Sequence, residues 1–289
     1  MALGNHVENP FEYVLEKLSW AVAGVFRPRD PAQRAAARVE PTVRRIEAAD
    51  LWDSLRKGVS DFGAARDDVV FIAIIYPLAG LMLAAVAMRY ELLPMVFPLL
   101  SGFALVGPLA AVGLSEISRR REAGQEISWM DAGRVFGSPA IGTILQLGLI
   151  LIALFVLWLG CAYAISLVAF GDGPPATVEG FLRQVFATGE GWRMAAIGIG
   201  VGFLFAVAAF AVSVVSFPLL LDRHADLDVA IRTSLKVVAQ NPATMALWGV
   251  IVAAALAIGS LPALMGLIVV VPVLGHATWH LYRKAVAPD

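Results

Sequence analysis

The stretch PMVFPLLSGFALVGPLAAVGLSEISRRREAG, residues 94–124, decides the fold of this chain. Residues 93–114 run for 22 positions without a charged side chain. About 20 helical residues are enough to cross the roughly 30 Å hydrocarbon core of a bilayer. Arg119, Arg120 and Arg121 follow directly, and such basic clusters mark the cytoplasmic end of a span. The stretch therefore predicts a membrane-spanning helix whose C-terminal end lies in the cytoplasm.

The composition of the whole chain agrees with this. The mean hydropathy is +0.75, and 59% of residues are hydrophobic while 16% are charged. An ordinary soluble domain has about half apolar and about a quarter charged residues, so that class is excluded. A net charge of −1 gives no electrostatic basis for binding nucleic acid. The single cysteine, Cys161, cannot form an internal disulfide, and its apolar surroundings favour a packing role.

Further apolar stretches predict an all-α, polytopic membrane protein with six transmembrane helices. These helices are expected at residues 69–88, 93–114, 141–170, 194–221, 243–260 and 263–281. If the connections alternate sides, 19 of the 22 Lys and Arg residues fall on one side of the membrane. Because basic residues concentrate on the cytoplasmic side, both termini are predicted to be cytoplasmic.

Residues 1–68 are predicted to form a cytoplasmic arm, and residues 69–285 the transmembrane domain. One amphipathic helix is expected after Asn9 and Pro10. A second begins near Asp50, and its apolar side is formed by Leu51, Leu55, Val59 and Phe62. Such helices can lie on the lipid bilayer, cover the ends of the spans or contact a membrane-protein partner.

An internal repeat of three units is also predicted. Each pair of spans follows an amphipathic segment, and the three segments are LWDSLRKGVSDF (51–62), ISWMDAGRVFG (127–137) and LDVAIRTSLKVV (227–238). The second span of each pair contains a proline, and Pro108, Pro218 and Pro272 are expected to kink their helices. Repeats are common in transport folds, but duplication also builds bundles that transport nothing.

Equal offsets from the three prolines predict a polar cluster at the cytoplasmic side. Its members are Glu116, Asp222, His224, His276 and His280. Imidazole and carboxylate together suit zinc or iron, and they can also relay protons. The alternative is that these are ordinary side chains at the water boundary. The sequence assigns no metal and no cofactor to them.

Three classes of function remain open. No ionisable residue lies deep in a predicted span, whereas pumps and ion-coupled carriers usually contain one. A non-enzymatic accessory or assembly protein is therefore favoured. The first alternative is a passive channel or transporter for a small solute, lined by Tyr76, Gln146 and Ser213. The second is a metal-dependent activity at the cytoplasmic face, although the sequence has no phosphate loop and no HExxH motif.

Four strings carry a resemblance to a known family, over about residues 50–286. They are FPLLSGFALVGPLAAVGLSEISRRREAG (97–124), SFPLLLDR (216–223), NPATMALWGVIV (241–252) and VLGHATWHLYRK (273–284). They resemble a bacterial inner-membrane family known only as a domain of unknown function, in which an aromatic often replaces Ser115. The resemblance implies a helical protein of the bacterial inner (plasma) membrane without an assigned activity.

Members of that family are sometimes labelled as cytochrome c oxidase subunit I. Such a subunit requires deep histidine ligands for haem and copper. This chain has four histidines, and none lies in the middle of a predicted span. The label therefore does not fit this sequence.

The predicted topology has a direct test. A reporter enzyme fused after Lys284 should be active only in its cytoplasmic form, because an even number of spans returns this position to the side of the arm. A reporter inserted at Gly173, between the third and fourth predicted spans and on the other side of the membrane, should be active only in its periplasmic form. A periplasmic signal after Lys284 would contradict the six-span prediction.

Overall fold

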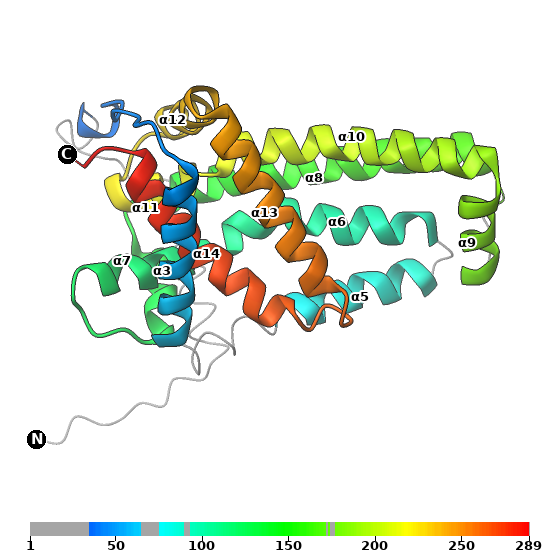
Figure 1. Ribbon diagram of the computed structural model, residues 1–289, viewed down its shortest axis with the longest axis horizontal. Helices are drawn as coiled ribbons and strands as arrows, with labels where there is room; N and C mark the ends of the chain where they lie inside the picture. Colours follow the sequence, from blue (N-terminus) through cyan, green and yellow to red (C-terminus); the bar gives the residue numbers. More distant parts are fainter. Residues whose placement is uncertain (1–34, 65–74, 90–92, 172, 174–176, 289) are drawn as a thin grey trace, which may run out of the picture.

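The computed structural model describes residues 35–64, 75–89, 93–171, 173 and 177–288. Long helices run along the main axis of the molecule, and a group of shorter helices gathers at one end (Figure 1). The long helices are α5 (Ile75–Arg89), α6 (Leu93–Ala110), α8 (Ile141–Phe170), α10 (Gly189–Ser213) and α13 (Pro242–Ser260). At the opposite end, α9 (Val178–Ala187) crosses the axis.

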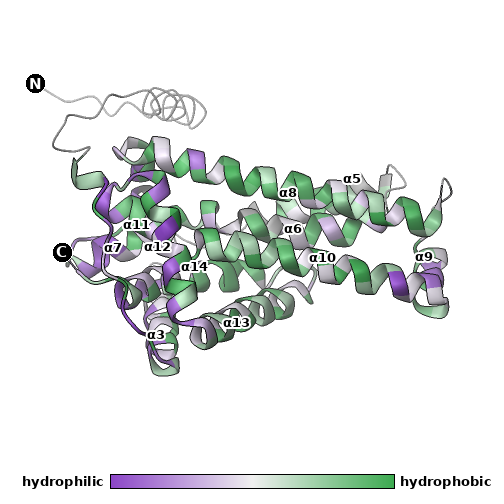
Figure 2. Ribbon diagram, turned by 90° about the horizontal axis from the view of Figure 1, so that it is seen from above, coloured by the Kyte–Doolittle hydropathy of each residue, from purple (hydrophilic) through white to green (hydrophobic). Residues whose placement is uncertain are grey.

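The long helices form an apolar rod that exposes large hydrophobic side chains. Val156 and Val168 of α8 are 60% and 90% exposed, and Phe203 of α10 is 65% exposed. Figure 2 shows the same helices coloured as hydrophobic, with hydrophilic residues collected at the ends. A helix of 30 residues such as α8 is about 45 Å long, enough to cross a bilayer. This exposed apolar surface fits contact with lipid.

Four helices among the described residues are long and apolar enough to cross a membrane. They span Leu93–Glu122, Ile141–Phe170, Gly189–Arg223 and Pro242–Ser260, and they correspond to the second to fifth predicted spans. The first predicted span, 69–88, lies partly outside the described residues, and its described part is α5. The sixth corresponds to α14 (Leu267–Ala285), which is not among the four. The six-span count and the repeat therefore stay predictions.

Inside the rod, one face of α8 packs against α6 and α10. Leu147, Leu151 and Trp158 are buried on this face. The indole nitrogen of Trp158 donates a hydrogen bond to the carbonyl of Pro98 in α6, at 3.1 Å. A side chain at Gly202 of α10 would lie 3.0 Å from the Trp158 ring, so this glycine lets the two helices approach closely.

Short helices form the polar cap, which we define as α3 (Ala48–Ala64), α7 (Val112–Glu122), η1 (Trp129–Gly137), α11 (Ser216–Arg223), α12 (Leu227–Gln240) and the last turns of α14. The three amphipathic segments of the predicted repeat become α3, η1 and α12. The middle one is a 3₁₀ helix rather than an α-helix. Gly133, Gly137 and the following Pro139 disfavour a longer α-helix there.

The helix boundaries near the prolines differ from one another. α6 ends at Ala110, two residues after Pro108, and α7 resumes at Val112. α10 ends at Ser213 and α11 begins at Ser216, because Pro218 has no N–H to bond the carbonyl of Val214. α14 continues through Pro272. The kinks at the three prolines stay predictions.

A segment before α3 ties the cap to the other end of the chain. The N–H of Arg44 bonds to the carbonyl of Ala285 at 2.8 Å, and the N–H of Ala287 bonds to Thr42 at 2.9 Å. The side chain of Asn241, between α12 and α13, accepts a hydrogen bond from the N–H of Ile46 at 2.9 Å. These bonds fix residues 42–46 across the cap.

The contact between α3 and α14 depends on a glycine. A Cβ at Gly58 would lie 2.7 Å from the carbonyl oxygen of Val273 and 2.8 Å from the Cβ of Ala277. A Cβ at Gly63, on the same helix, would meet no atom within 4 Å. Gly58 therefore sets how closely the two helices pack.

We expect Gly58→Ala to lower the free energy of unfolding by about 1–3 kcal/mol, because α3 would have to move away from α14. Gly63→Ala is the matched control, and it should be neutral or stabilising by up to about 1 kcal/mol. Thermal or denaturant unfolding of the detergent-solubilised protein measures both. Equal effects of the two substitutions would contradict close packing at Gly58.

Candidate functional site

A buried carboxylate, Asp61, joins three helices of the polar cap. One of its oxygens, Oδ2, accepts a hydrogen bond from the hydroxyl of Ser118 at 2.6 Å and lies 2.8 Å from Nε2 of His280. Its other oxygen, Oδ1, accepts one from Arg121 at 2.5 Å. Asp61 is only 5% exposed. It thus connects α3 to α7 and to α14.

The packing of α3 brings Asp61 inside. The buried positions of this helix are Leu51, Ser54, Gly58 and Asp61, with Leu55 and Phe62 beside them. Val59, which the sequence placed on the same side as Leu51, is 55% exposed instead. The buried face follows the close contact at Gly58, which brings small and polar residues to the inside and leaves Val59 at its edge.

His276 extends the network of Asp61. Its Nδ1 lies 2.8 Å from the hydroxyl oxygen of Ser118, and the side chain is fully buried. Ser118 has one hydroxyl hydrogen, with which it donates a hydrogen bond to Asp61, so its oxygen accepts a hydrogen bond from the Nδ1–H of His276. This assignment leaves the Nε2 of His276 as a buried acceptor, without a hydrogen-bond partner among the described residues.

The pKa of Asp61 reflects these contacts. Burial alone would raise it, but the hydrogen bonds from His280 and Ser118 and the nearby imidazole charges hold the pKa below its usual value. Asp61 is therefore ionised at neutral pH and balances the charge of Arg121.

The structure separates the five residues of the predicted cluster. His276 and His280 lie around Asp61. Asp222 accepts a hydrogen bond from the hydroxyl of Tyr282 at 2.7 Å, and burial raises the pKa of that hydroxyl. Glu116 and His224 line a different place, a cavity described below. Within the described ranges, no group of three or more His, Cys, Asp or Glu side chains is arranged to hold a metal ion.

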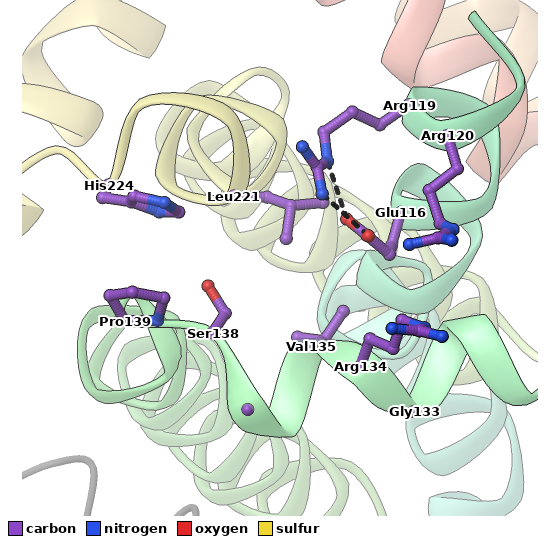
Figure 3. A pocket seen from close by; sticks show the side chains of 11 residues that line it. Glu116, Arg119, Arg120, Gly133, Arg134, Val135, Ser138, Pro139, Leu221 and His224 are labelled. Carbon is purple, nitrogen blue, oxygen red and sulfur yellow. Dashed lines mark hydrogen bonds and ion pairs between the residues drawn. The ribbon is translucent and has the colours of Figure 1, made fainter. Parts of the chain in front are cut away.

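The cavity has a volume of about 460 Å³ and lies between α7, η1, the start of α8 and the end of α11. Figure 3 shows its side chains facing a common space. The polar and charged residues that line it are Glu116, Arg119, Arg120, Arg134, Ser138 and His224. Sequence reasoning interpreted the arginines only as markers of membrane orientation, because nothing in their spacing shows that η1 folds back against α7.

Two carboxylates orient these arginines. Glu116 accepts two hydrogen bonds from the guanidinium of Arg119, at 2.7 and 2.8 Å. Asp131 of η1 accepts one from Arg134 at 2.5 Å and lies 3.5 Å from Nε of Arg120. Burial would raise the pKa of Asp131, but the backbone N–H of Ser128 and the arginines lower it. Asp131 is thus held as an anion.

The comparison with known families covers the region of this cavity. The family model described as "Predicted integral membrane protein (DUF2189)" matches residues 96–222. This chain is an integral membrane protein. The match confirms the resemblance to a membrane family of unknown function, and it extends from α6 almost to the end of α11. Searches among curated proteins and among solved structures gave no match.

The Asp61 network predicts a specific effect on stability. Asp61→Asn should lower the free energy of unfolding by about 1.5–3 kcal/mol, because Arg121 and His280 lose a buried anionic partner. Asp53→Asn, on the same helix, is the control. Asp53 contacts Lys57 and Lys284 at the surface, so its loss should cost less than about 1 kcal/mol.

The dependence on pH provides a second readout. Because the pKa of Asp61 is lower in the folded than in the unfolded chain, its contribution is complete above pH ~4 and is lost as the pH falls through the lower folded value. Unfolding measured from pH 6 to pH 2 should therefore show a smaller acid-induced loss in Asp61→Asn than in the unmodified protein. Identical pH profiles would show that Asp61 is not held as an anion.

Proposed function

We propose that this protein is a non-enzymatic accessory or assembly protein of the bacterial inner membrane. It crosses the bilayer six times, keeps both termini in the cytoplasm and acts through its polar cap. One observation carries the proposal: α3 exposes Trp52 and Val59, by 59% and 55%, although this helix belongs to the polar end of the molecule. We call Trp52, Arg56 and Val59 the α3 patch.

The α3 patch has the chemistry of a protein contact. Its residues are separated by four and three positions, so they share one face of the helix. The guanidinium of Arg56 lies 5.5 Å from the centre of the Trp52 ring. Tryptophan and arginine are enriched among the residues that dominate binding energy at interfaces. The opposite face of α3 is already occupied by α14.

The charge of the patch indicates its partner. Arg56 adds positive charge beside the apolar side chains, whereas the neighbouring Lys57 is paired with Asp53. An acidic, amphipathic segment at the cytoplasmic face of another membrane protein would match both properties. The excess of Lys and Arg on the side of the cap supports this orientation, since basic residues favour the cytoplasm.

The channel or transporter alternative places three polar residues along a solute path, and the surroundings of two of them favour a packing role instead. Gln146 is on the exposed side of α8. Ser213 is buried and donates its hydroxyl proton to the carbonyl of Ala209 on its own helix, at 2.6 Å. The side chain of Tyr76 lies outside the described residues. Because Gln146 and Ser213 point to different surroundings, they do not support a common track.

Site-specific photo-crosslinking tests the proposal in living cells. Trp52 is replaced with p-benzoylphenylalanine, which keeps an aromatic side chain, and the cells are irradiated. We expect one discrete protein adduct, identified by mass spectrometry. Leu235 on α12, which is 44% exposed on the same cap, is the matched control position and should give no such adduct.

The adduct should also depend on the rest of the patch. Adding Val59→Ala to the crosslinking variant should lower its yield several-fold, because the partner loses part of its apolar contact. An adduct to lipid alone, an adduct within the same chain, or equal protein adducts from positions 52 and 235 would contradict a specific partner.

A further inference from the structure

The cavity between α7 and η1 concentrates positive charge on one side of the molecule. Arg119 and Arg120 come from α7, Arg134 comes from η1, and His224 faces them from the end of α11 (Figure 3). A volume of about 460 Å³ lies within the range of cavities that bind small ligands. Three guanidinium groups around one space favour an anion there.

The carboxylates nearby do not cancel this charge. Glu116 pairs with Arg119, and Asp131 serves both Arg134 and Arg120. Within these pairs, three guanidiniums meet two carboxylates; Asp222 also interacts with Arg119, but it is itself paired with Arg283. Each guanidinium has five N–H donors, and Glu116 uses two of those on Arg119. The carboxylates thus fix the arginine side chains and leave donors for a ligand.

Arg120 is the best placed of these donors. Its side chain is only 20% exposed. Its Nε atom is buried and has no hydrogen-bond partner among the described residues. This nitrogen lies 3.5 Å from the Asp131 carboxylate, so the terminal N–H groups of the same guanidinium are the donors that an anion in the cavity can use. The N-terminus of α8, which follows Ser138 and Pro139, adds the positive end of a long helix to the same wall.

The position of the cavity along the helices indicates where its ligand is found. The second, third and fourth predicted spans end at residue 114, begin at residue 141 and end at residue 221, respectively. The residues that line the cavity lie within a few positions of these three span boundaries. The cavity therefore lies at the depth where lipid headgroups meet water, and basic pockets at this depth bind anionic headgroups.

We propose that this cavity binds the phosphate group of an anionic phospholipid headgroup. Arg120 and Arg134 hold the phosphate oxygens, Arg119 is held in place by Glu116, and the apolar side chains of Val135 and Leu221 face the lipid glycerol. The inference is independent of the protein partner proposed for α3. The same phosphate chemistry could be supplied by a soluble phosphate ester, and the experiment separates these two sources.

The experiment measures lipid binding to the full chain in detergent micelles. Native mass spectrometry counts bound phosphatidylglycerol and phosphatidylcholine during titration of each lipid. We expect the unmodified protein to prefer phosphatidylglycerol. Arg120→Gln combined with Arg134→Gln should weaken phosphatidylglycerol binding roughly thirtyfold, because each basic residue near a lipid headgroup contributes about 1 kcal/mol. The control is Arg45→Gln with Arg183→Gln, which removes the same charge outside the cavity and should retain the preference.

Glu116→Gln keeps the proposal testable if the double variant does not fold. It leaves every arginine in place and removes one negative charge from the cavity, so phosphatidylglycerol should bind more tightly than to the unmodified protein. Thermal unfolding without added lipid shows whether each variant is folded.

Competition with glycerol 3-phosphate identifies the source of the phosphate. Strong displacement of phosphatidylglycerol by millimolar glycerol phosphate would support the phosphate site and assign it to a soluble ester. Weak displacement would assign it to lipid. The proposal is overturned if the cavity double variant is folded and retains the lipid preference, or if Glu116→Gln is folded and binds phosphatidylglycerol no more tightly.

Discussion

A peptide group in hydrocarbon has no water with which to form hydrogen bonds, so each N–H and carbonyl must be satisfied within its own helix. This constraint makes the long helices of the rod continuous and nearly free of charge. It also moves charged side chains to the ends. None of the 30 residues of α8 has a charged side chain. The polar cap is the consequence, since side chains excluded from lipid must find partners where the helices emerge.

In the cap, several charged side chains pair with side chains of other elements. Asp61 bonds to residues of α7 and α14, Glu122 contacts Trp279 and Arg283, and Glu40 pairs with Arg232 and Lys236 of α12. Asp61 is the buried charge among them, and a buried charge is tolerated only when paired, so its contacts fix how α3, α7 and α14 are oriented, whereas the pairs of Glu40 and Glu122 lie nearer the surface. The cap is therefore a rigid base from which α3 and the arginine cavity present their groups.

The parts of the fold with a simple physical signal could be predicted from sequence. Four predicted spans coincide with apolar helices because long charge-free stretches in α6, α8, α10 and α13 leave little alternative. Asp61 could not be found this way. Its partners Ser118 and His280 are 57 and 219 residues away, and an acidic residue in a polar arm looks like an exposed one. In the structure the residues of the predicted cluster occur in different surroundings: Glu116 and His224 line the cavity between α7 and η1, whereas His276 and His280 lie around Asp61.

The segment that crosses the cap also constrains how this protein is made. Ile46 bonds to the side chain of Asn241, 195 residues further along, and Arg44 bonds to Ala285, the last residue of α14. The ribosome synthesises Asn241 only after α12 and Ala285 only at the end of α14, so during insertion the backbone groups of this segment must remain solvated. Closing such a long loop is entropically demanding and slow. The polar cap therefore acquires its final shape late in biogenesis, and a chain with a missing or misplaced span would be recognisable to quality-control proteases by an open cap.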